Sequence, residues 1–183
     1  MQKTILRFGL ISGIISSALM LATVPFTNSL AHGNVGYLVG YTGIVLSFLM
    51  VYFGIRSYRD NLAGGHITFG RAFSVGILIT LISCCFYVIT WEIVYFNFMP
   101  NFMDNYGAHA LATMKAAGAS AAALQAKAAE FDQLKRNYKN PLYNAAMTFM
   151  EPFPVGLLVT LISAAVLRKK ALPQSTSATL PAD

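Results

Sequence analysis

Two acidic side chains lie inside otherwise apolar stretches, and they are the residues best suited to chemistry. Glu92 occurs in Thr-Trp-Glu-Ile-Val-Tyr and Glu151 in Phe-Met-Glu-Pro-Phe-Pro. A carboxylate is costly to bury in hydrocarbon, so acids in such segments usually face the interior of a helix bundle and often mark function. Counted from basic residues at the opposite helix ends, Glu92 and Glu151 lie about 31 Å and about 25 Å along their helices, which are similar depths.

Three interpretations of these acids are open. Both could lie at a wet interface and accept hydrogen bonds from Thr90, Thr148, Trp91 or free backbone groups. They could instead form a carboxylate pair that shares a proton or cation, as in a transporter, because close like charges favour protonation of one member. An enzyme active site is least favoured, because no serine–histidine arrangement, metal-spaced histidines or phosphate-binding loop accompanies them.

The histidines and cysteines predict no metal site and no reactive thiol. His32, His66 and His109 fall in three different loops, which argues against a shared metal site. Cys84 and Cys85 are adjacent within an apolar run, where small polarizable packing residues are expected. We therefore assign no catalytic, cofactor-binding or metal-binding residue, expect no cofactor, and lean against an enzyme.

The elements that must position the acids are apolar segments long enough to cross a membrane. Hydrophobic residues make up 56% of the 183 residues and charged residues only 11%, whereas a soluble domain has about 25% charged residues. The net charge of +6 could suggest nucleic acid, but the basic residues sit at the ends of apolar runs rather than in a polar patch. We expect the lipid bilayer as a partner, and no nucleic acid.

We predict an all-α fold, an integral membrane four-helix bundle that forms one domain over residues 1–170. Spans are expected at about residues 8–28, 35–55, 72–98 and 144–167, with a helical extracytoplasmic loop at 104–138 and a disordered tail at 171–183. Thr68 and Ser120 can cap helices through their hydroxyls. Pro152 and Pro154 should bend or restart the fourth span, because proline removes a backbone donor.

The first apolar segment could be a cleaved signal or a retained helix. Ser29-Leu30-Ala31 resembles a cleavage site, but the run is longer than a usual signal core. We favour a retained helix, which Pro25 should end or bend.

Two further patterns predict helix packing. Leu124, Phe131 and Tyr138 recur every seven residues as a narrow stripe, which we expect to pack on the preceding helix or the membrane rim, with a partner surface as the alternative. Residues 75–83 match residues 155–163 almost residue for residue, as in an inverted internal repeat, and we favour chance or shared packing chemistry over duplication as the cause. In both copies glycine, threonine and serine fall on one helical face, which suits close helix contact.

The basic residues predict the orientation. If both termini are cytoplasmic, eight of the thirteen basic residues lie on the cytoplasmic side, in short flanks next to spans. We therefore predict a multi-pass protein of the bacterial cytoplasmic (inner) membrane with both termini inside. The topology anchors are Arg56, Arg59, Arg71, Arg168, Lys169 and Lys170.

Several ordered motifs resemble the bacterial membrane family filed as domain of unknown function 4199 (DUF4199). The resemblance implies a retained first helix and four spans, and it implies no activity, substrate or catalytic residue. The motifs lie between about residues 5 and 170 and are GIRSYRD at 54–60, GHITFGRAF at 65–73, AGAS at 117–120, YKNPL at 138–142, EPFPVG at 151–156 and the terminal basic cluster.

Two functional classes follow. We expect a non-enzymatic membrane module, an accessory or interaction subunit acting through its small-residue helix faces and outer loop, either as a homo-oligomer or with another membrane protein. The alternative is a small ion- or proton-coupled transporter that uses Glu92 and Glu151, as a homodimer. The transporter hypothesis requires the two carboxyl groups within about 6 Å of each other.

Overall fold

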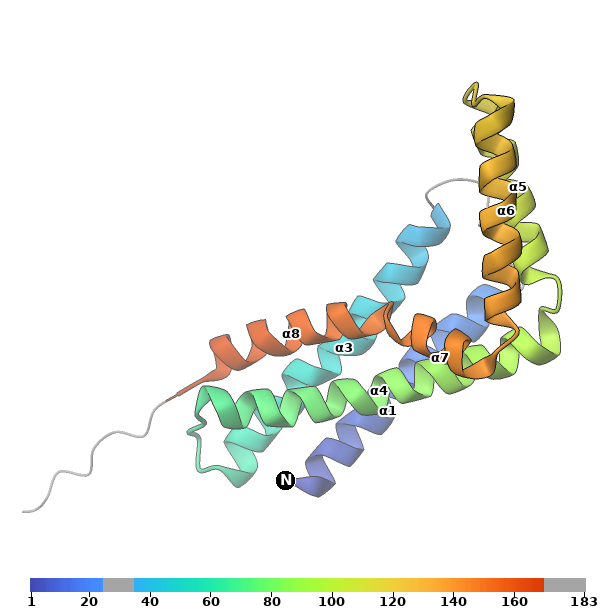
Figure 1. The fold of residues 1–183 in the computed structure, drawn as a ribbon. Helices are drawn as coiled ribbons and strands as arrows, with labels where there is room; N and C mark the ends of the chain where they lie inside the picture. The colour runs from blue at the N-terminus through green and yellow to red at the C-terminus, as the bar shows by residue number, and fades with distance from the viewer. Residues whose placement is uncertain (25–34, 170–183) are drawn as a thin grey trace, which may run out of the picture.

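The computed structural model describes residues 1–24 and 35–169, and these residues form an all-helical protein (Figure 1). The spans are formed by α1 (Gln2–Thr23), α3 (Val35–Leu62), α4 (Phe69–Phe98) and the consecutive helices α7 (Pro141–Phe149) and α8 (Pro152–Leu167). Between α4 and α7, α5 (Phe102–Ala116) and α6 (Ala121–Tyr138) form a helical hairpin. Four segments are long and apolar enough to cross a membrane, with α7 and α8 counting as one segment.

Some sequence predictions fall on parts of the chain outside the described residues. These are the role of Pro25, the cleavage site near Ala31, and the disordered tail at 171–183.

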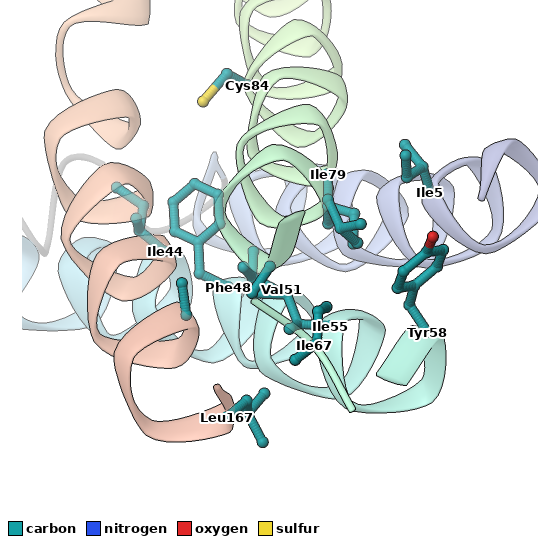
Figure 2. Close-up of a cluster of buried hydrophobic side chains, with 13 residues drawn as sticks. Ile5, Ile44, Phe48, Val51, Ile55, Tyr58, Ile67, Ile79, Cys84 and Leu167 are labelled. Atoms are coloured by element: carbon teal, nitrogen blue, oxygen red, sulfur yellow. The ribbon is translucent and has the colours of Figure 1, made fainter. Parts of the chain in front are cut away.

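The central helix of the bundle is α4. It packs against α1, α3, α7 and α8, while α3 also contacts α1 and α8. Side chains of α3 supply much of the buried core, and Figure 2 shows Phe48 and Val51 pointing into the space between α4 and α8. Both are at most 1% exposed, and Ile79 of α4 is completely buried beside them.

Small residues set the distance between α1 and α4. A Cβ atom added at Gly9 would lie 2.9 Å from Ile82, and one added at Gly13 would lie 2.6 Å from the Phe86 ring. Neither position has room for a side chain, so the α1 backbone lies directly on α4 side chains. This is the close contact that small residues allow between membrane helices.

The two copies of the internal repeat pack against each other. A Cβ atom at Gly76 of α4 would lie 2.8 Å from Thr160 of α8, and one at Gly156 of α8 would lie 2.5 Å from Thr80 of α4. The hydroxyl oxygens of Thr80 and Thr160 are 2.9 Å apart. Since α4 and α8 run in opposite directions (Figure 1), the same small-residue face is used from both sides of one contact.

Buried hydroxyl groups join the other helices. The Ser12 hydroxyl oxygen of α1 lies 2.8 Å from the Ser47 carbonyl oxygen of α3 and 2.9 Å from the Ser83 hydroxyl oxygen of α4. Nearer the other end of these helices, Thr90 donates to Ser17 over 2.7 Å. A hydrogen bond between membrane helices contributes about 0.6 kcal/mol on average, so these bonds fix register as much as they add stability.

The connector between α3 and α4 is a short turn. Helix α3 continues past Ile55 to Leu62, and the turn occupies residues 63–68. Gly64 and Gly65 have φ angles of 61° and 81°, in the left-handed region that glycine adopts most readily. Thr68 caps α4 as predicted, since its hydroxyl oxygen accepts from the Arg71 amide over 3.4 Å.

Hydrogen bonds join the connector to the end of α8. The backbone of Ile67 both donates to and accepts from Lys169, at 3.0 Å and 2.9 Å. Arg59 donates to the Leu167 carbonyl over 3.4 Å, and Arg71 donates to the Tyr58 hydroxyl over 3.1 Å. The described topology anchors therefore gather at one end of the bundle, here called the connector end, while Lys170 lies outside the described residues.

Candidate functional site

The break between α7 and α8 positions Glu151. Pro152 and Pro154 have no amide hydrogen, so the carbonyl groups of Thr148 and Met150 lose their usual helical donors. Accordingly α7 ends at Phe149 and α8 begins at Pro152, which places Glu151 at the break. The sequence predicted an interruption of the fourth span by these prolines, and the structure has it here.

Glu151 contacts α4 through Tyr87. The Tyr87 hydroxyl donates to Oε2 of Glu151 over 3.1 Å. In α6, partial burial raises the pKa of Tyr138, and the negative charge of Glu151 adds to that shift. The Glu151 carboxylate therefore accepts a hydrogen bond from α4 and influences the ionisation of a tyrosine at the base of the hairpin.

A second polar contact between α4 and α7 lies close by in sequence. Asn144 is completely buried, and its Oδ1 accepts from Nε1 of Trp91 over 2.9 Å and from the Thr148 hydroxyl over 3.2 Å. These two donors fix which way the amide points. Its Nδ2 group is left buried without a hydrogen-bond partner among the described residues, an arrangement that costs about 1–3 kcal/mol.

Glu92 has a different setting from Glu151. It follows Tyr87 by five residues on α4, so the two side chains leave the helix about 140° apart. Oε1 of Glu92 is shielded from solvent and has no hydrogen-bond partner among the described residues, whereas Oε2 of Glu151 is bonded to Tyr87. The two acids thus form no hydrogen bond with each other in the described structure, and their use as a coupled pair stays a prediction.

A series of aromatic rings joins the hairpin to the spans, and we call it the aromatic ladder. Trp91 of α4 lies 5.1 Å from Phe102 of α5, and Tyr95 of α4 lies 6.1 Å from Tyr138 of α6, between ring centroids. Such separations are typical of favourable aromatic pairs. The full ladder comprises Trp91, Tyr95, Phe102, Tyr106, Phe131, Tyr138 and Tyr143.

The hairpin itself is held by contacts between α5 and α6. The Phe131 ring lies 5.8 Å from the Tyr106 ring and packs over Gly107, where an added Cβ atom would meet it at 3.4 Å. Lys135 and Asp104 form an ion pair across the hairpin. Phe131 thus packs on the preceding helix, as the heptad stripe predicted, whereas Tyr138 packs on the end of α4.

The hairpin turn also follows the sequence prediction. Ser120 caps α6, because its hydroxyl oxygen accepts from the Ala123 amide over 3.2 Å. Gly118 has a φ angle of 81°, which suits glycine and ends α5. Figure 1 shows the hairpin turning away from the direction of α4 and projecting beyond the spans.

The remaining chemistry-bearing residues are dispersed. His66 lies at the connector end, with Nδ1 2.9 Å from the Gly64 carbonyl oxygen, whereas His109 lies in α5 of the hairpin and His32 is outside the described residues. Cys84 is buried in the core and Cys85 is exposed. Within residues 1–24 and 35–169, no three histidine, cysteine, aspartate or glutamate side chains come close enough to hold a metal ion.

Sequence reasoning did not identify Asn144 or Tyr87 as partners in this site. A signal was present, because Asn144, Thr148 and Glu151 follow the i, i+4, i+7 spacing of one helical face. What was missing was the rotation of α4, which determines that Tyr87 and Trp91 face these residues. The resulting cluster offers a carboxylate and a buried amide donor, chemistry suited to hydrogen bonding and to holding helices in register.

One of three comparisons with known proteins gives a match. Residues 7–169 match the model of the family described as "Protein of unknown function (DUF4199)". Comparison with curated proteins and with solved structures gives no match. The matched residues take in most of the first candidate span, all of the other three, the hairpin and the cluster around Glu151. The chain belongs to the DUF4199 family, whose description assigns no activity.

Proposed function

We propose that this protein is a non-enzymatic membrane module, a four-span scaffold that presents the α5–α6 hairpin to another membrane protein. The aromatic ladder is the observation that carries the proposal. It connects both hairpin helices to α4 and α7 through successive ring contacts. A loop that only linked two spans would not need such a base, whereas a recognition element gains affinity when its orientation is fixed in advance.

The packing of the small-residue faces inside the bundle also favours the hairpin as the surface for a partner. Gly9 and Gly13 pack on α4, and Gly76 and Gly156 pack within the seam between α4 and α8. These faces are occupied inside the bundle and are not free for a partner. The hairpin, in contrast, has no buried residue in α6.

We place the protein in the bacterial inner membrane with both termini cytoplasmic and the hairpin outside. The gathering of basic residues at the connector end supports this orientation, since positively charged flanks favour the cytoplasmic side. Reporter fusions test it. A reporter active only in the cytoplasm should work after Lys170, and one active only in the periplasm should work when inserted at Gly118. The reverse pattern would refute the orientation.

Site-specific photo-crosslinking in whole cells tests the function. A photoreactive residue at the exposed Gln125 of α6 should give a discrete crosslinked protein, while one at the exposed Ile162 of α8 should give lipid adducts only. The crosslink from α6 should disappear when Phe131→Ala loosens the hairpin. Equal crosslinking from Gln125 and Ile162 would contradict a role for the hairpin.

A small ion- or proton-coupled transporter is the second candidate, favoured by the shielded, unpartnered Oε1 of Glu92. Unpaired acids inside membrane segments often mark ion pathways. On this hypothesis Glu92→Gln and Glu151→Gln should each abolish ion-dependent uptake into vesicles, while Glu130→Gln on the exposed face of α6 should not. Normal uptake in both intramembrane variants would exclude it.

A further inference from the structure

A shallow groove lies between α1 and α3 at the connector end. Its volume is about 410 Å³. The half toward the middle of the bundle is apolar and is lined by Phe8, Met50 and Phe53. The half toward the helix ends is polar and is lined by Arg56, Ser57, Asp60 and Asn61.

The polar half has an excess of positive charge. Asp60 is bound closely by Arg59, at 2.7 Å, and only loosely by Arg56, at 3.6 Å. The Arg56 side chain remains 56% exposed. Because Arg59 already neutralises Asp60, Arg56 is available to an anion.

Residues in α1 add to the positive charge beside the groove. Lys3 and Arg7 precede Phe8 on the same helix, and both are exposed. In the described part of the connector end, Asp60 is the one acidic residue, against seven basic ones. The local field therefore favours a negatively charged ligand.

We propose that this groove binds an anionic phospholipid, with an acyl chain against Phe8, Met50 and Phe53 and the headgroup phosphate at Arg56. Guanidinium groups bind phosphate oxygens in a two-pronged geometry. Basic pockets between membrane helices are known sites for anionic headgroups. The groove is open on one side, which suits a lipid because the bilayer covers that side.

The order of residues along α3 matches the order of groups in a phospholipid. Met50 and Phe53 come first, and Arg56, Ser57 and Asn61 follow toward the helix end. An apolar chain and a polar headgroup would therefore meet matching surfaces at the depth each occupies in a bilayer. The site needs only that the four spans cross a membrane, and it is independent of any partner of the hairpin.

Native mass spectrometry of the delipidated full-length protein tests the proposal. Phosphatidylglycerol and phosphatidylcholine with the same acyl chains are titrated separately. The first phosphatidylglycerol should bind more tightly than the first phosphatidylcholine, and Arg56→Gln should weaken phosphatidylglycerol binding about fivefold. Arg136→Gln, on the exposed face of α6, is the matched charge control and should leave binding unchanged.

A second measurement locates the lipid in a bilayer. Phe53→Trp places an indole in the groove, while the wild type, with its single tryptophan at position 91 near the other end of α4, gives the baseline. Brominated phosphatidylglycerol should quench the added indole more than brominated phosphatidylcholine at equal mole fraction. Arg56→Lys, which keeps the charge, should retain most of this preference, and Arg56→Gln should lose it.

Three outcomes would overturn the proposal. They are equal binding of the two lipids, equal effects of Arg56→Gln and Arg136→Gln, and displacement of the lipid by soluble glycerol phosphate at equal concentration. The last would show a free-phosphate site rather than a lipid site.

Discussion

The hydroxyl groups of Thr80 and Thr160 meet 2.9 Å apart in the seam between α4 and α8. Each threonine also lies over the glycine of the opposite repeat, Thr80 over Gly156 and Thr160 over Gly76. The contact is therefore self-complementary, with each copy supplying the same two residue types in reversed order. A sequence pattern that occurs twice in the chain is used here as two halves of one interface.

The first prediction concerns the closeness of this seam. Gly156→Ala should destabilise the bundle by about 1–3 kcal/mol, the usual cost of overpacking a core. The added Cβ atom would lie 2.5 Å from Thr80 and 2.7 Å from the Phe48 ring. Loss of monodisperse protein on size exclusion after heating measures the effect. Gly40→Ala on α3 is the matched control, because nothing lies within 4 Å of its added Cβ atom. If both variants lose half of their monodisperse protein at the same temperature, the close packing at Gly156 is contradicted.

The second prediction concerns the amide at the center of the cluster between α4 and α7. Asn144→Ala leaves two donors, the Trp91 indole and the Thr148 hydroxyl, without their acceptor and removes one unpartnered group, the Asn144 Nδ2, so stability should fall by about 1–3 kcal/mol net. Because Trp91 is the single tryptophan of the sequence, its emission spectrum should shift in this variant before any heating. Asn97→Ala, at an exposed position on α4, should change neither quantity. An unaltered spectrum in Asn144→Ala would show that the indole bond does not form.

The third prediction concerns the base of the hairpin. Phe131→Ala removes the ring contact with Tyr106 and the packing over Gly107. Trypsin should then cut within α5 and α6 several-fold faster, while the spans stay intact. Leu142→Ala serves as the control because its side chain is 80% exposed. If both variants are cut at the wild-type rate, the ladder does not hold the hairpin.

The fourth prediction is a dependence on high pH through Tyr138. Burial, and then the charge of Glu151, raises its pKa above the usual value of 10.0. In the unfolded chain the phenol loses its proton near pH 10, whereas in the folded protein it keeps it to higher pH. The folded state then binds more protons, so stability should decline as pH rises past 10. Tyr138→Phe keeps the ring and removes the ionisation, so its thermal midpoint should fall less between pH 9 and pH 11. If the thermal midpoints of the wild type and Tyr138→Phe fall equally with pH, the ionisation of Tyr138 is not the cause.

Much of this architecture could be predicted from local features of the sequence. The four apolar segments, the caps at Thr68 and Ser120, and the interruption at Pro152 each depend on composition or on a few neighbouring residues. The stripe through Phe131 and Tyr138 depends on a seven-residue period along one helix. Such signals lie within one helix and its neighbouring residues, so they do not depend on what that helix packs against.

The contacts between helices were harder to predict, because they depend on how each helix is rotated. Glu92 and Glu151 have similar calculated depths, which suggested a pair, but depth says nothing about direction around the axis. Tyr87 and Glu92 differ by about 140° in that direction. The length of α3 beyond the predicted span at residues 35–55 has another reason. Hydropathy falls at Arg56, so the sequence signal for a span ends there, whereas the helix itself continues to Leu62.

The backbone pairing of Ile67 with Lys169 has a consequence for the order in which the protein is made. The turn before α4 is synthesised about a hundred residues before Lys169, its backbone partner at the end of α8. Until α8 enters the membrane, the glycine and threonine face of α4 lacks its contact with Thr160 and Gly156, and the turn lacks its backbone hydrogen bonds to Lys169. A chain stalled before residue 152 would expose that face to lipid and to other newly made helices. Assembly of the bundle is thus completed by its last segment, and truncation there should be more damaging than its distance from the hairpin would suggest.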